Sequence, residues 1–228
     1  MELLDILLLF AVGSFLGVVV ETVYCYIMTG KLVSRRGMVY GPFNQVYGFG
    51  AVLLTTILSP LAGKSAWVLF LGAAILGGLF EAACSYVQEA MYGTVSWEYS
   101  GQRLSLLGGR TSVTYMVFWG VLGMIYIGLV HPFLFGLFAQ IPLFVKAPAV
   151  IALTAFLAWD LLLSAVAVGR WHRRLEGLAP VGKRDVWLDA HFPDERMRSI
   201  YPSMMPPRRK KPGGGEKKTK QILYSEGP

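Results

Sequence analysis

A long apolar run near the start of the chain decides the fold. Residues 3–28 read LLDILLLFAVGSFLGVVVETVYCYIM, and only Asp5 and Glu21 carry a charge in this run. The hydrocarbon core of a bilayer is about 30 Å thick, and a helix needs about 20 mostly apolar residues to cross it. The run lacks the small-residue cleavage site of a removable signal peptide. We therefore predict a permanent transmembrane helix over residues 3–28.

Four further segments have the same length and apolar character, and turn- or helix-breaking residues separate them. They span about residues 41–60, 65–91, 111–138 and 147–169, and we expect the fourth to kink or stop at Pro132. Hydrophobic residues make up 54% of the 228-residue chain and charged residues only 15%. A water-soluble globule of this composition would have too little polar surface to cover itself. The predicted fold class is therefore an all-α polytopic membrane bundle of about five transmembrane helices.

Basic residues divide the predicted loops into two groups. The loop after the first helix, the loop before the fourth and the end of the fifth are basic, whereas the alternate loops hold only Lys64 and Lys146. Cytoplasmic loops are enriched in lysine and arginine. We therefore expect a multi-pass protein of the cell membrane, or of the inner membrane where a cell has two. Its N-terminus would lie outside and its C-terminal tail in the cytoplasm.

The chain changes character after residue 170. Residues 1–170 form the predicted transmembrane bundle, and residues 171–228 form a basic, partly disordered cytoplasmic tail with proline, glycine and lysine runs. Most of the net charge of +7 lies in this tail, so we expect it to contact anionic lipid headgroups of the bilayer. No basic groove with interleaved aromatic residues is present, so nucleic acid is not an expected partner. The sequence predicts no metal site and no cofactor.

Several carboxylates fall inside the predicted helices, and a carboxylate deep in the membrane costs about 2.5–3.5 kcal/mol. Glu21 and Glu81 lie in the cytoplasmic half of the first and third helices, and Asp160 lies near the middle of the fifth. Glu89 lies one or two turns beyond Glu81, near the interface. An ionisable residue inside a membrane is a candidate functional residue by default.

Two interpretations of these carboxylates remain open. In the first, they line a polar site whose candidate substrate-binding or pathway residues are Glu21, Arg36, Tyr40, Tyr47, Glu81, Glu89, Arg103, Arg110 and Asp160. In the second, Glu21 pairs with Arg36 and Glu81 pairs with Arg110, and the pairs only fix the bundle. A helix N-terminus after Pro42 could bind an anion together with Arg36. The nearby glycines equally fit close helix packing.

The predicted bundle contains an internal repeat of two helices. Gly17 and Glu21 in the first helix have counterparts in Gly77 and Glu81 in the third, four residues apart in each case. A polar loop with an adjacent arginine and glycine follows each helix. The next helix then carries an aromatic–glycine pair, Tyr47-Gly48 or Trp119-Gly120. The first and third helices would run in the same direction, so the repeat is predicted to be parallel.

Several short motifs together resemble one known family. They are Ser14-Phe15-Leu16-Gly17 with Glu21, Arg36-Gly37, Tyr40-Gly41-Pro42, Tyr47-Gly48-Phe49-Gly50, Glu81, Glu89, Trp97, Tyr99-Ser100, Gly109-Arg110 and Trp119-Gly120. The combination covers roughly residues 10–135 and resembles the CmpB-type ABC-transporter permeases. The family tends to have proline at Gln45, aspartate at Glu98 and an Asn-Leu pair near Leu104. These departures indicate a divergent member.

The resemblance implies a transporter or permease component in the membrane. The sequence contains no nucleotide-binding domain, so the resemblance also implies a separate ATP-binding subunit as partner. The residues leave two other functions open. One is an intramembrane enzyme in which Glu21 or Glu81 is a general base for a lipid-like substrate held by Arg36 and Arg110. The other is a structural or regulatory membrane partner whose buried charges only lock the fold.

Overall fold

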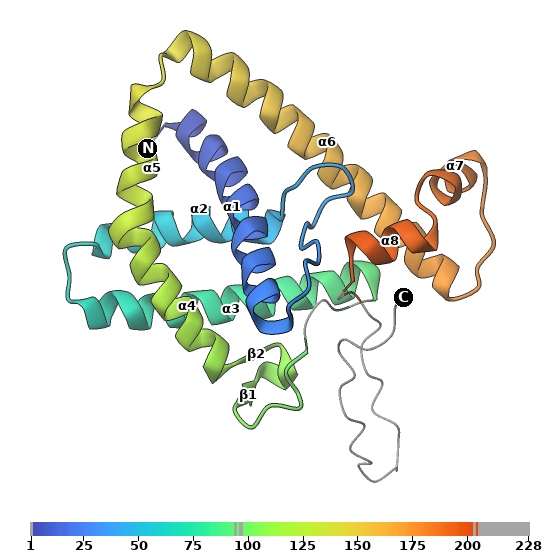
Figure 1. Ribbon diagram of the computed structural model, residues 1–228, viewed down its shortest axis with the longest axis horizontal. Helices are drawn as coiled ribbons and strands as arrows, with labels where there is room; N and C mark the ends of the chain where they lie inside the picture. Colours follow the sequence, from blue (N-terminus) through green and yellow to red (C-terminus); the bar gives the residue numbers. More distant parts are fainter. Residues whose placement is uncertain (1, 94, 96–97, 203, 205–228) are drawn as a thin grey trace.

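The structure is a computed structural model that describes residues 2–93, 95, 98–202 and 204. Its helices are α1 (Leu3–Thr29), α2 (Gln45–Leu58), α3 (Ala66–Tyr92), α4 (Val113–Ile125), α5 (His131–Gln140), α6 (Leu143–Leu175), α7 (Lys183–His191) and α8 (Asp194–Ile200). Short 3-10 turns cover Ser59–Leu61 and Leu107–Gly109, and a π turn covers Tyr126–Val130. The two-residue strands β1 (Ser105–Leu106) and β2 (Thr111–Ser112) pair antiparallel. Figure 1 shows that helices form the whole framework.

Four continuous helices are long and apolar enough to cross a membrane. They cover Leu3–Thr29, Ala66–Tyr92, Val113–Gln140 and Leu143–Leu175, and Gln45–Leu61 is a shorter apolar helix. Large apolar side chains such as Ile27, Leu129 and Leu162 lie exposed on the outer surface of the long helices. Such a surface is unfavourable in water and natural against lipid. The structure confirms the predicted all-α polytopic membrane bundle, in which the second apolar segment is the short one.

The short segment begins its helix at Gln45 rather than at residue 41. Pro42 disfavours helical geometry in the residue before it, and Asn44 caps α2 by accepting a hydrogen bond from the backbone N–H of Val46 at 3.2 Å. The backbone N–H of Asn44 in turn donates to the carbonyl of Ser14 in α1 at 2.9 Å. Residues 30–44 therefore form a loop between α1 and α2, which passes beside α6 (Figure 1).

Pro132 does not end the fourth apolar segment. Proline has no N–H, and its ring crowds the carbonyl four residues earlier. The chain widens into the π turn Tyr126–Val130 directly before α5, where Pro132 occupies the first helical turn. The hydroxyls of Tyr126 and Thr55 share a hydrogen bond of 2.7 Å, which ties this turn to α2. The expected break is therefore a local widening of one continuous helix.

Two helix pairs form the centre of the bundle, because α1 packs along α2 and α3 packs along α4. The largest buried apolar cluster joins the two pairs and includes Leu9, Leu54, Leu69, Ile127 and Phe138. The long helix α6 contacts α1 and α3 from the side. The polar side chains of the candidate site lie on α1, α2, α3, α4 and α6 and on the loops between these helices.

The chain beyond α6 folds back onto the bundle as a C-terminal cap, which we define as residues 176–202. A second buried cluster joins Val39 of the α1–α2 loop, Trp171 of α6 and Leu188, Phe192 and Ile200 of the cap. Figure 1 shows α7 and α8 at the C-terminal end of α6. The predicted boundary after residue 170 lies inside α6, and the division into bundle and tail stays a prediction. The proline–glycine–lysine end of the tail, residues 205–228, lies outside the described residues.

Candidate polar site between the helix pairs

Asp160 is fully buried on α6 and holds the α1–α2 loop. Its carboxylate accepts hydrogen bonds from the backbone N–H groups of Tyr40 (3.2 Å) and Gly41 (2.7 Å). One turn along α6, the hydroxyl of Ser164 accepts a hydrogen bond from the N–H of Val39 at 2.9 Å. A buried carboxylate is stable when donors of this kind surround it. The contacts of Asp160 are therefore those of an anchor for the loop.

The side chain of Tyr40 belongs to the same anchor. Its ring stacks on Trp159 of α6 with centroids 5.5 Å apart. The guanidinium of Arg196 on α8 lies 5.4 Å from the centroid of the Tyr40 ring. These contacts place Tyr40 at the junction of α6 and the C-terminal cap.

Glu21 is half-buried on α1 and faces the start of α2. The side chain of Tyr47 lies close enough to its carboxylate to interact with it, and Nδ2 of Asn44 donates to Oε2 at 3.4 Å. Arg35 is close enough to attract this carboxylate electrostatically. Nε of Arg35 also donates to Sγ of Cys25, one turn beyond Glu21, at 2.9 Å. Glu21 thus lies among an arginine, an amide and a tyrosine, with part of its surface exposed.

Glu81 is buried on α3, with 8% of its surface exposed, and its contacts are more complete. The hydroxyl of Tyr99 donates to Oε1 at 2.7 Å, and the hydroxyl of Thr111 donates to Oε2 at 2.9 Å. The indole of Trp119 on α4 also lies close to this carboxylate. Each carboxylate oxygen therefore has a short hydrogen bond from a neutral donor, which offsets much of the cost of burial.

The two carboxylates approach the same tyrosine. Both Glu21 and Glu81 lie near enough to Tyr47 to act electrostatically on its hydroxyl, and Glu21 is the stronger influence. Arg35 acts on the same hydroxyl with the opposite sign. The structure therefore brings Glu21, Tyr47 and Glu81 into one polar cluster, to which α1, α2, α3 and the adjoining loops contribute.

In the part of the chain that the structure describes, the arginines do not form the ion pairs Glu21–Arg36 and Glu81–Arg110 of the second interpretation. Arg110 forms an ion pair with Glu89, and its Nη1 donates to Oγ of Ser85 at 2.9 Å. Nε of Arg36 is buried and has no hydrogen-bond partner in the described part of the chain. Arg103 lies exposed in the loop before β1. Arg35, rather than Arg36, lies beside Glu21.

The predicted repeat reappears as a set of equivalent contacts. A Cβ added at Gly17 would overlap the ring of Tyr47, and a Cβ added at Gly77 would overlap the ring of Trp119. In the same way, Gly48 faces Phe10 and Gly120 faces Phe70, while Gly13 faces Ala51 and Gly123 faces Ala73. One constant offset along the chain relates α1 to α3 in these contacts, and another relates α2 to α4. Glycines let the helix backbones approach closely at these points.

The equivalence extends to the arginines that follow each pair's first helix. Arg35 donates to Cys25, and Arg110 donates to Ser85, and both acceptors lie one turn beyond the glutamate of their helix. Sequence reasoning aligned Arg36 with Arg110 because each adjoins a glycine. It also left out Tyr99 and Thr111, which reach Glu81 from a loop and a two-residue strand. Trp97, part of the family motif, lies outside the described residues.

The fold is that of a multi-pass membrane protein. It has four helices of membrane-spanning length, polar side chains enclosed between the helix pairs and an apolar outer surface. A family model described as "Putative ABC-transporter type IV" matches residues 8–165. The chain therefore belongs to this CmpB-type, ABC-transporter-type family. Comparison with curated proteins and with solved structures gives no significant match.

Proposed function

We propose that the chain is the membrane component of a transporter, that Glu21, Arg35 and Tyr47 form its polar substrate site, and that Glu81 fixes the neighbouring helix pair. The observation that carries the proposal is the partly exposed carboxylate of Glu21, which accepts a hydrogen bond from Asn44 and lies close to Arg35 and Tyr47. A bundle held together only by buried ion pairs would pair each glutamate directly with an arginine, whereas Glu81 is held by neutral donors. Membership of an ABC-transporter-type family supports transport over the two other functions.

Within this proposal the remaining candidates have supporting roles. Glu89 and Arg110 form an ion pair at the rim of the site. Asp160 and Tyr40 fix the α1–α2 loop that carries Arg35 and Asn44 toward Glu21. Glu21 is the residue that we expect to contact the substrate, because it is the less buried of the two glutamates and lies beside the arginine.

The proposed partner is a separate ATP-binding subunit, which the family membership supports. The full chain, tagged and purified from membranes of its own host in mild detergent, should retain an ATPase subunit that mass spectrometry identifies. A purification that repeatedly yields the chain without an ATPase would count against this partner.

Transport can be tested without knowing the substrate. Inside-out vesicles from the host, with the chain present or deleted, are incubated with a host metabolite extract with and without ATP. We expect untargeted mass spectrometry to find solutes whose accumulation or depletion needs both ATP and the chain. Glu21→Gln should abolish this difference, and Glu195→Gln on the exposed face of α8 should leave it unchanged.

Two outcomes would reject the proposal. If Glu21→Gln moves solutes as the native chain does, Glu21 is not in the substrate site. If the deletion leaves solute movement unchanged but alters the lipid composition of the membrane, an enzyme acting on a lipid-like substrate replaces the transporter.

The proposed orientation places the N-terminus outside and the C-terminal cap in the cytoplasm, in line with the basic loops. It is tested in a variant in which Cys25 and Cys84 are replaced by serine. A membrane-impermeant thiol reagent applied to intact cells should label Lys64→Cys and leave Lys183→Cys unlabelled until the cells are opened. The opposite labelling pattern would invert the topology.

A further inference from the structure

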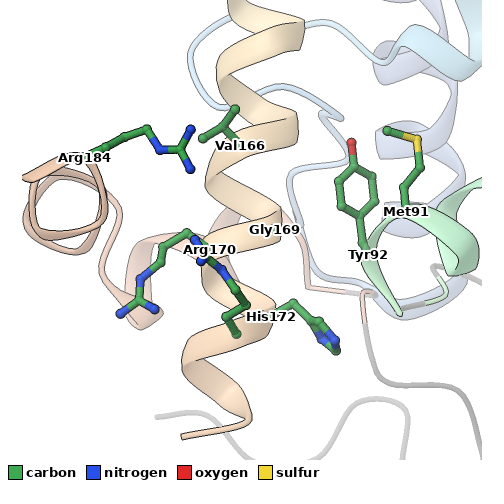
Figure 2. A pocket seen from close by; sticks show the side chains of 8 residues that line it. Met91, Tyr92, Val166, Gly169, Arg170, His172 and Arg184 are labelled. Atoms are coloured by element: carbon green, nitrogen blue, oxygen red, sulfur yellow. The ribbon is translucent and has the colours of Figure 1, made fainter. Parts of the chain in front are cut away.

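A cavity of about 350 Å³ lies away from the glutamate cluster, where the end of α3, the end of α6 and α7 meet. Val166, Gly169, Arg170 and Arg173 line it from α6, and the spacing of these residues puts them on one helix face. Met91 and Tyr92 line it from the end of α3. Figure 2 shows Arg184 reaching from α7 to the level of Val166.

The lining of this cavity is cationic. It contains Arg170, Arg173, Arg184 and His172, and no carboxylate is among its lining residues in the described part of the chain. Arg170 is buried and committed to Asp189 through two hydrogen bonds of 2.9 and 2.7 Å. It therefore fixes the wall of the cavity rather than binding a ligand.

Two of the arginines keep donors for a ligand. Arg173 uses Nη2 for Asp185 at 3.0 Å, and its Nε and Nη1 form no hydrogen bond with a described residue. Arg184 has only a 4.0 Å contact with Asp185, and 73% of its side chain is exposed. Asp185 is itself occupied by the N–H of Val181 at 3.0 Å. Two guanidinium groups thus face a shared space with unused N–H groups, an arrangement suited to a phosphate.

Part of the lining of the cavity is apolar and lies exposed on the surface of the protein. Met91 and Val166 are exposed there by 61% and 38% of their surface. A Cβ added at Gly169 would meet nothing within 4 Å, so the space above this residue is empty of protein. A ligand with a negatively charged head and a hydrocarbon chain could contact the arginines with its head and the apolar residues with its chain.

We propose that this cavity binds the phosphate group of an anionic phospholipid. The arginines would bind the phosphate, and the apolar part of the lining would contact the hydrocarbon chain. The proposal narrows the expected contact of the basic tail, residues 171–228, with headgroups to one site, because Arg173 and Arg184 of that tail line the cavity together with residues of α3 and α6. It also stands independently of the proposed transport function, since none of its residues belongs to the glutamate cluster.

Native mass spectrometry of the full chain in detergent tests the proposal with three probes: dioleoyl-phosphatidylglycerol, dioleoyl-phosphatidylcholine and inorganic phosphate. We expect one phosphatidylglycerol to bind the native chain about tenfold more tightly than phosphatidylcholine, as for one charge-assisted hydrogen bond. Arg173→Gln and Arg184→Gln should each remove about this tenfold preference. Arg198→Gln, which removes an exposed arginine of α8 that does not line the cavity, should retain it.

Gly169→Leu provides a test that changes no charge. Leucine favours helices more than glycine does, and its side chain would fill the empty space, so the fold should persist while phosphatidylglycerol binding is lost. The melting temperature of each variant in phosphatidylcholine detects unfolding. Inorganic phosphate that binds as tightly as phosphatidylglycerol, and is lost in the same variants, would support a free phosphate as the source. Native-like phosphatidylglycerol binding in Arg184→Gln and Gly169→Leu would overturn the site.

Discussion

The α1–α2 pair and the α3–α4 pair have equivalent helix-packing contacts, but the surroundings of their glutamates differ. Gly17 packs on Tyr47 as Gly77 packs on Trp119, so the helices cross in equivalent places. Glu81 then receives short hydrogen bonds from Tyr99 and Thr111 and is buried. Glu21 lacks equivalents of these two hydroxyl donors among the described residues and stays partly exposed beside Arg35.

From this difference we infer a structural role for Glu81 and a functional role for Glu21 within a repeated framework. A carboxylate whose two oxygens already accept hydrogen bonds from the protein has little free capacity to bind a ligand. Removing it leaves buried donors without acceptors. A carboxylate with an exposed edge and a nearby cation can exchange a protein contact for a substrate contact. We infer that the second pair fixes the bundle and that the first pair carries the exchangeable site.

The largest expected effect is the loss of stability in Glu81→Ala. The substitution leaves the hydroxyls of Tyr99 and Thr111 without their acceptor, so we expect a loss on the order of 3 kcal/mol in the free energy of unfolding. Glu21→Ala should cost less than about 1 kcal/mol, because Glu21 is partly exposed and Asn44 keeps its hydrogen bond to the carbonyl of Arg35. Unfolding of the full chain by sodium dodecyl sulfate in mixed micelles measures both. Equal losses would remove the proposed division of roles.

The next largest effect tests whether the two pairs pack equivalently. Gly17→Ala and Gly77→Ala place a methyl group into an aromatic ring across the helix crossing, and each should destabilise the bundle by about 1–3 kcal/mol. Gly136→Ala on α5 is the matched control, since a Cβ there meets nothing within 4 Å. It should be neutral or stabilise by about 0.5–1 kcal/mol. A Gly17 variant as stable as the control would show that the α1–α2 crossing is looser than the α3–α4 crossing.

The sequence predicts those features of the fold that the lipid bilayer determines. The length of an apolar run reports the thickness of a bilayer, so four of the five segments appear as long helices near their predicted ranges. The second segment is shorter because Pro42 and the capping side chain of Asn44 delay its helix. Both signals are local, and both are present in the sequence.

The contacts of the polar cluster depend on loop paths, which no periodicity reports. The choice between Arg35 and Arg36 as the neighbour of Glu21 follows from the path of residues 30–44, which Asp160 fixes from far along the chain. Tyr99 reaches Glu81 from an irregular segment for the same reason.

Acid should separate the C-terminal cap from both helix pairs. Hydrogen bonds from Arg170 and Arg174 hold the pKa of Asp189 below its usual value, and the N–H of Val181 and the guanidinium of Arg173 do the same for the pKa of Asp185. A lowered pKa in the folded state gives stability that is present above the unfolded value of about 4 and is lost as the pH falls below it. Hydrogen–deuterium exchange at pH 7 and pH 3.5, corrected for intrinsic rates, should therefore show the cap opening at the lower pH. Peptides of α4, which contains no carboxylate, are the internal control. A cap that stays as protected as α4 would mean that its apolar cluster alone holds it.

The smallest effect comes from exchanging the acceptors of the two equivalent arginines. Sulfur is a weaker acceptor than a hydroxyl, so Cys25→Ser should strengthen the contact of Arg35 and stabilise the chain by about 0.5 kcal/mol. The reverse change, Ser85→Cys, should weaken the contact of Arg110 and destabilise the chain by a similar amount. Cys84→Ser, next to Ser85 but without a described hydrogen bond, controls for the loss of a thiol. The melting temperatures of the three variants in one detergent are compared. If Cys25→Ser destabilises the chain while Ser85→Cys does not, the two arginines are not equivalent, and the likeness of the pairs ends at the helices.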